Sequence, residues 1–119
     1  MTVQNLFAQT SFITKDGSAI RSILDRTNAP VQKQSLAEAR LPAGSRTERH
    51  YHKVAEELYF ILEGAGEIEL DGERRMVGPG DAILIPRELG TRSWLQSRYA
   101  FSAAARPLIR TRIRIWNNR

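Results

Sequence analysis

The feature that most limits the fold of this chain is a regular series of short apolar runs separated by turn signals. Between residues 57 and 86 such signals stand at residues 64–66, 71–72 and 79–80. An Asp-Gly pair favours a tight two-residue hairpin, and a Pro-Gly pair favours a turn whose glycine has a positive φ. No stretch has a helical period long enough to form a helix of several turns. The sequence therefore predicts an all-β fold, either a sandwich or a barrel.

Alternation of apolar and polar residues indicates where the strands lie. Residues 34–41 predict a strand with small residues facing the core, and residues 67–71 predict a strand whose three acids form a wet face. The tail alternates over residues 108–116, which is compatible with a last strand that fills the sheet or stays frayed. The other expected strands are residues 11–14, 19–24, 57–63, 73–77 and 81–85.

The only two histidines of the chain stand two residues apart, as His50 and His52. On a strand, both side chains project from the same face. Glu57 follows after a short polar break at residues 53–55, where the chain can turn back beside the first strand. Two imidazoles and one carboxylate can hold a divalent metal such as iron, manganese, zinc or nickel and leave coordination positions open. The alternative is that the two histidines are solvated side chains on an exposed edge.

This spacing resembles the first motif of the cupin superfamily, and residues 71–86 resemble the second. The resemblance covers residues 34–86, is weaker from about residue 10, and ends after Pro86. It implies a cupin jelly-roll β-barrel, also called a double-stranded β-helix, with His50, His52 and Glu57 as metal ligands. The residues that carry the first motif are Gly44, His50, His52, Glu57 and Gly64.

The resemblance also implies a fourth ligand, a histidine five residues after the proline that ends the second motif. This chain has Thr91 at that position and contains no third histidine. The three-histidine, one-glutamate site of the family therefore cannot be completed by this chain alone, and Gln96 or water could replace the histidine only weakly. We expect Tyr59, Ile61, Thr91 and Gln96 to line the pocket.

Composition indicates one domain over residues 1–119, with residues 1–9 as an N-terminal arm. A chain of 119 residues with 41% hydrophobic content is long enough for one core. It has no cysteine, which excludes disulfides and a cysteine nucleophile. The sequence also lacks a signal-like start and an apolar run long enough to span a membrane, so we expect a cytoplasmic protein with no membrane partner.

The net charge of +5 belongs to the tail. Residues 1–86 carry 10 basic and 12 acidic residues, whereas residues 87–119 carry 8 arginines and one acid. This atypical basic segment raises the alternative of nucleic-acid binding, but it contains no recognisable binding motif, and we do not expect nucleic acid as a partner. A second explanation is a base lost near the codons of Pro86 and Arg87. Re-reading the next codons one base earlier permits Pro-Gly-Thr-Arg-His-Gln-Ile, which restores the missing histidine.

Taken together, these patterns and the resemblance predict a metal-binding protein that acts on a small molecule. Cupins include dioxygenases, isomerases and decarboxylases, and a dioxygenase-type oxidoreductase is the enzyme we expect. No catalytic acid or base can be assigned, although Arg40 or Arg49 could meet an anionic substrate. The alternative is a non-catalytic metal or small-ligand binding module with an incomplete site. Both faces of residues 57–63 are apolar, which predicts a homodimer.

Overall fold

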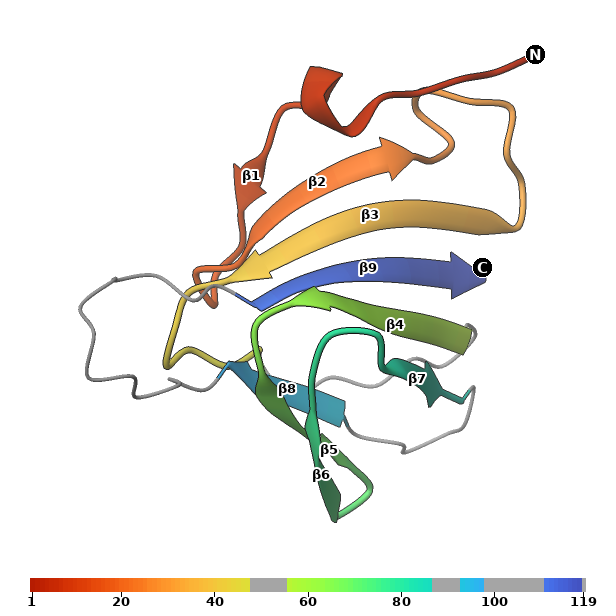
Figure 1. Cartoon of the computed structure of the whole chain (residues 1–119). Coiled ribbons are helices and arrows are strands. Elements are labelled where there is room, and N and C mark those ends of the chain that lie inside the picture. The colour runs from red at the N-terminus through yellow and green to blue at the C-terminus, as the bar shows by residue number, and fades with distance from the viewer. Residues whose placement is uncertain (48–55, 87–92, 98–110, 119) are drawn as a thin grey trace.

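The structure, a computed structural model, describes residues 1–47, 56–86, 93–97 and 111–118 of the chain. It consists of two β-sheets with a short 3-10 helix near the N-terminus (Figure 1). The elements in chain order are η1 (Leu6–Ala8), β1 (Phe12–Ile13), β2 (Ala19–Leu24), β3 (Gln34–Leu41), β4 (Glu56–Glu63), β5 (Gly66–Leu70), β6 (Glu73–Val77), β7 (Ala82–Ile85), β8 (Ser93–Ser97) and β9 (Thr111–Asn118). Each predicted strand is therefore present, with ends that differ by at most three residues.

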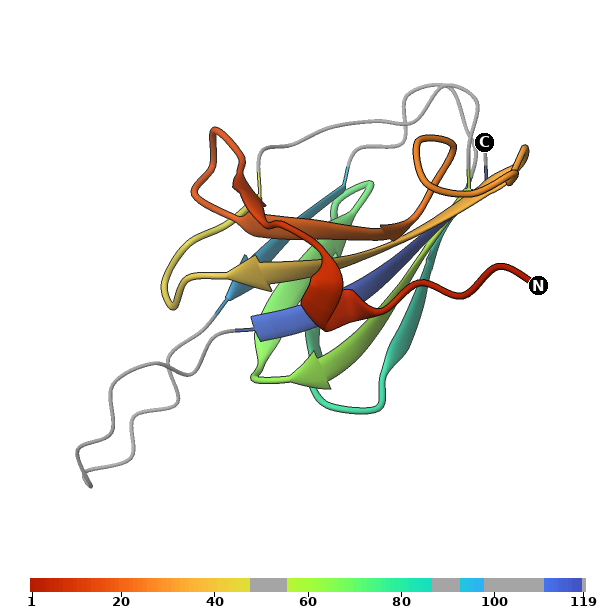
Figure 2. The ribbon, with the colours of Figure 1, turned by 90° about the horizontal axis from the view of Figure 1, so that it is seen from above.

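The large sheet has the strand order β1-β2-β3-β9-β4-β7, and the small sheet has the order β6-β5-β8. All neighbouring strands are antiparallel. The C-terminal strand β9 pairs with β3 on one side and with β4 on the other, and η1 lies beside β2 near the far edge of the large sheet (Figure 1, Figure 2). The tail thus supplies a central strand of the large sheet.

The hairpin between β5 and β6 is the tight turn that the sequence predicts. Asp71 has a φ of 49° and Gly72 has a φ of 87°. A type I′ turn requires a positive φ at both central residues, and aspartate followed by glycine suits that geometry. This turn sets the register in which Leu70 pairs with Glu73.

The core lies between the sheets and is built from the inward-facing residue of each alternating pair. On β3 the small residue Ala39 and the end residue Leu41 face inward, and both are buried. The prediction that small residues of this strand face the core is therefore confirmed. The buried core cluster consists of Ala39, Leu41, Tyr59, Ile61, Ile68, Val77 and Ile85.

The prediction that all the acids of residues 67–71 lie on a wet face is wrong for Glu69. Glu69 is only 6% exposed, and its Oε2 lies 2.9 Å from Nε of Arg74 on the neighbouring strand β6. Glu38 on β3 is similarly buried and lies 3.0 Å from Nε of Arg40. A buried carboxylate is tolerated when it is paired, and the apolar stem of an arginine can cover it.

The outer face of the large sheet carries an apolar row that crosses several strands. Leu58 pairs in register with Leu84 on β7, and the two residues are 46% and 52% exposed. Nearer the β1 edge of the sheet, Leu24 of β2 pairs with Leu36 of β3. In the register of the sheet, the backbone position of Trp116 on β9 lies between the two pairs, because it is the partner of both Leu36 and Leu58. Both faces of β4 are therefore apolar, as the sequence indicates.

Candidate functional site

Glu57 is the predicted metal ligand that lies within the described residues. β4 begins at Glu56, so alternation directs Glu57 to the inner face of the large sheet together with Tyr59 and Ile61. Glu57 is 6% exposed, and its register partner on β7 is the buried Ile85. The fold therefore directs one carboxylate into an otherwise apolar interior.

Tyr59 is the neighbour of Glu57 on this face, and it is also buried. Burial raises the pKa of the Tyr59 phenol far above its usual value of 10.0. The negative charge of Glu57, a hydrogen bond to that carboxylate and the charge of Asp16 raise the pKa further. The phenol therefore remains protonated at neutral pH and can donate its hydrogen to Glu57. A carboxylate held in this way has a restricted orientation.

Asp16 belongs to the turn between β1 and β2, which is close enough to influence Tyr59. Its Oδ1 accepts hydrogen bonds from Thr14 Oγ1 at 2.5 Å and from the backbone N–H of Ser18 at 2.9 Å. These contacts form an Asx-type turn that positions the carboxylate. The sequence marks residues 15–17 only as a turn and gives no signal that this acid influences a core tyrosine.

Three of the other residues predicted at the metal centre, His50, His52 and Thr91, lie outside the described residues. The backbone of Gln96 lies in β8, where its register partner is Glu67. Among residues 1–47 and 56–86, no three histidine, cysteine or acidic side chains gather into a group that could hold a metal ion. In these ranges, Glu57 is the member of the predicted ligand set that the fold places.

The two predicted lining residues that the structure describes share the inner face with Glu57. Ile61 is completely buried and Tyr59 is nearly so. Arg40, by contrast, is paired with Glu38 and stands next in sequence to the inward-facing Ala39 and Leu41, so strand alternation places it on the outer face of β3. Arg40 is therefore not positioned to meet a substrate between the sheets, and Arg49 lies outside the described residues.

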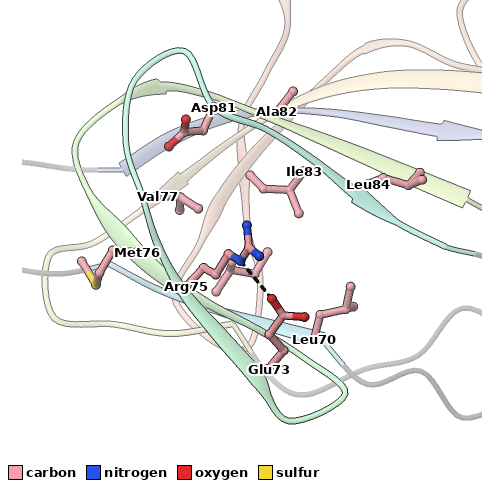
Figure 3. A pocket seen from close by; sticks show the side chains of 10 residues that line it. Leu70, Glu73, Arg75, Met76, Val77, Asp81, Ala82, Ile83 and Leu84 are labelled. Atoms are coloured by element: carbon pink, nitrogen blue, oxygen red, sulfur yellow. Dashed lines mark hydrogen bonds and ion pairs between the residues drawn. The ribbon is translucent and has the colours of Figure 1, made fainter.

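A pocket of about 350 Å³ lies between β6 and β7, the strands at the ends of the two sheets (Figure 3). Residues from β5, β6 and β7 line it, and Glu57 is not among them. The sequence patterns did not predict this pocket. The pair Glu73 and Arg75 could have indicated it, because these two charged residues share one face of β6 with the buried Val77.

No helix in the described parts of the chain is long and apolar enough to cross a membrane.

Known proteins resemble this chain in sequence. Residues 37–92 match the family model described as "Cupin domain". The chain is 52% identical over 75 residues to an uncharacterised protein of Methanocaldococcus jannaschii, an alignment that covers 63% of this chain and 60% of that protein. The chain spans 49 to 60% of the length of the curated relatives that it matches.

Solved structures share the fold over nearly the whole chain. The polyketide cyclase RemF of Streptomyces resistomycificus has a TM-score of 0.78 at 22% identity, with 99% of this chain and 79% of that chain covered. A predicted oxalate decarboxylase of Thermotoga maritima has a TM-score of 0.75 at 17% identity, with 98% of each chain covered. At these identities the likeness establishes the fold and not the activity. Residues 37–92 thus match a cupin domain, and the described chain has the all-β jelly-roll fold of the cupins.

Proposed function

We propose that this protein binds a divalent metal through His50, His52 and Glu57 and acts on a small molecule at that site. The observation that carries the proposal is the burial of the Glu57 carboxylate on the inner face of the large sheet. Neutral imidazoles and a carboxylate form a donor set that suits iron, manganese, zinc or nickel. The two histidines stand six and four residues before Glu56, the first residue of β4, and their side chains share a face if residues 50–52 are extended.

The residues of this chain would contribute orientation and exclusion of water. Tyr59 donates a hydrogen bond to Glu57, which restricts the rotation of the carboxylate. Ile61 and the rest of the core cluster form an apolar wall, which strengthens electrostatic interactions inside. A bound metal would supply Lewis acidity or redox chemistry and open positions for a substrate.

The reaction class we favour is dioxygenase-type oxidation, with isomerisation or decarboxylation as the other candidates. Support for chemistry on small molecules comes from the structural neighbours, one of which is a polyketide cyclase and another a predicted oxalate decarboxylase. A non-catalytic binding module is the second candidate function. The observation that favours it is Thr91 at the position of the fourth ligand, together with the absence of a third histidine from the sequence.

Metal analysis of tag-free protein tests the proposal. We expect close to one equivalent of iron, manganese, zinc or nickel, lost in His52→Ala and in Glu57→Gln. Glu56→Gln is a matched control, because Glu56 precedes Glu57 on the same strand but is exposed. Wild-type protein that binds none of these metals would refute the proposal. A metal-loaded protein that converts none of a broad set of carboxylates, diketones and sugars would favour the binding module.

We infer that the protein binds a macromolecular partner in addition to a small molecule. This partner is another copy of this chain, docked on the outer face of the large sheet. The half-exposed pair Leu58 and Leu84 forms one end of the apolar row that crosses this face. Glu56 stands two positions from Leu58 on β4, and Arg21 of β2 is the register partner of Glu38, which stands two positions from Leu36 on β3. A face that carries an apolar centre with an acid and a base at different positions can complement itself about a two-fold axis.

A further inference from the structure

The pocket between β6 and β7 does not include Glu57, the described member of the proposed metal centre. β6 ends the small sheet and β7 ends the large sheet, so the two strands face each other without pairing. The turn at residues 78–81 joins them, and it is held by a hydrogen bond of 2.7 Å from the Gly78 N–H to Asp81 Oδ2. The space of about 350 Å³ between them lies within the size range of small-molecule sites.

Seven of the ten residues that line this pocket are apolar, and the other three are Glu73, Arg75 and Asp81. Ile68, Leu70 and Val77 line it from the small sheet, and Ile83 lines it from the large sheet. Ile68 and Val77 belong to the buried core cluster, while Leu70 and Ile83 pack against it. Contact with these side chains would remove the apolar part of a ligand from water, which is favourable in proportion to the area buried.

One arginine lines this pocket. Arg75 pairs in register with Ile68, which faces the core, so both side chains leave their strands on the inner side. Figure 3 draws Arg75 of β6 and Ile83 of β7 among the side chains that line the pocket. The Nε of Arg75 lies 2.9 Å from Oε1 of Glu73, and the arginine side chain is 76% exposed. Among the described residues, no other acid pairs with this guanidinium. Its terminal N–H groups can therefore donate hydrogen bonds to a second anion.

We propose that this pocket binds a small apolar carboxylic acid, whose carboxylate contacts Arg75 while its hydrocarbon part lies against Ile68, Leu70 and Ile83. A guanidinium offers two parallel N–H donors that match the two oxygens of a carboxylate. A neutral apolar ligand would leave those donors unused, and a small polar anion would leave the apolar walls unused. The combination therefore selects a ligand that has both parts.

This site does not depend on the proposed metal centre. Glu57 pairs with Ile85, whereas the pocket involves β7 residues from Ala82 to Leu84. The ordinary structural role of Glu73 and Arg75 would be to protect an edge strand, because inward-pointing charges discourage pairing with another chain. Protection of the edge predicts no affinity for a carboxylic acid, so a binding measurement distinguishes the two roles.

The experiment is a titration of isotope-labelled, metal-free protein with octanoate, followed by amide chemical shifts. We expect saturable shifts in β6 and β7 and a dissociation constant that rises about three- to tenfold in Arg75→Gln, a modest factor because the arginine is largely exposed. Glu73→Gln should lower the dissociation constant, because Glu73 competes for the same guanidinium. Lys33→Gln is the control, since it makes the same charge change at an exposed residue outside the pocket.

Octanol serves as the neutral probe with the same hydrocarbon chain, and it should bind wild type and Arg75→Gln equally. The proposal is overturned if octanoate causes no saturable shifts, if the shifts lie outside β5–β7, or if Arg75→Gln binds octanoate as tightly as wild type. Unchanged amide spectra of the free variants would show that they are folded. Because metal is absent throughout, these outcomes do not depend on whether His50, His52 and Glu57 bind a metal.

Discussion

Tyr59→Phe should cost stability at neutral pH, and this cost should shrink in alkaline solution. At pH 7 the variant loses the hydrogen bond from the phenol to the Glu57 carboxylate, which costs on the order of 1–3 kcal/mol. In alkali the wild type is penalised as well, because the folded protein keeps the phenol protonated while the unfolded chain ionises it. The phenol ionises less readily in the folded protein than in the unfolded chain because Tyr59 is buried, with only 5% of the residue exposed.

The sign and size of the alkaline effect follow from proton linkage. The pKa of Tyr59 is raised in the folded state, so above about pH 10 the unfolded chain binds fewer protons than the folded chain, and the free energy of unfolding falls as pH rises. The loss approaches roughly 1 kcal/mol per pH unit. The advantage of the wild type over Tyr59→Phe should therefore be smaller at pH 11 than at pH 7, by an amount on the order of 1 kcal/mol.

Urea denaturation of both proteins at several pH values between 7 and 11, with a chelator present, measures this change in the stability difference. Titration of the other tyrosines and of the lysines is common to both proteins and cancels in the difference. A difference that stays constant from pH 7 to pH 11 would show that the Tyr59 phenol titrates normally in the folded protein. That result would contradict the burial of the phenol beside Glu57.

Three further predictions concern the metal, the outer face and the core. Glu57→Gln should lower metal affinity at least tenfold in an equilibrium competition with a chromogenic chelator, whereas equal loss in Glu56→Gln would remove the special role of Glu57. Leu58→Asp and Leu84→Asp should each shift the mass measured by light scattering from dimer to monomer, and a wild-type monomer at high concentration would contradict the proposed dimer. Ile61→Ala should reduce the free energy of unfolding by about 2–5 kcal/mol, measured by urea denaturation, since Ile61 is completely buried; a cost below about 1 kcal/mol would contradict its place in the core.

Local patterns in the sequence determined the strands and their inner faces. A period of two depends only on neighbouring residues, so the alternation over residues 57–63 was enough to put Glu57, Tyr59 and Ile61 on one face. Asp71 and Gly72 determined the β5–β6 hairpin, because a type I′ turn requires positive φ at both positions. The pattern of His50 and His52 remains a prediction, because both lie outside the described residues.

The tertiary structure decided which segments lie side by side. Residues 108–116 predicted a strand, but only the fold put β9 between β3 and β4, because strand pairing joins residues far apart in the sequence. Glu69 stands at an alternating position typical of a wet face, yet Arg74 on the next strand pairs with it and it is buried. The pocket at Arg75 exists because the end strands of two sheets face each other without pairing. Alternation within one strand carries no information about that arrangement.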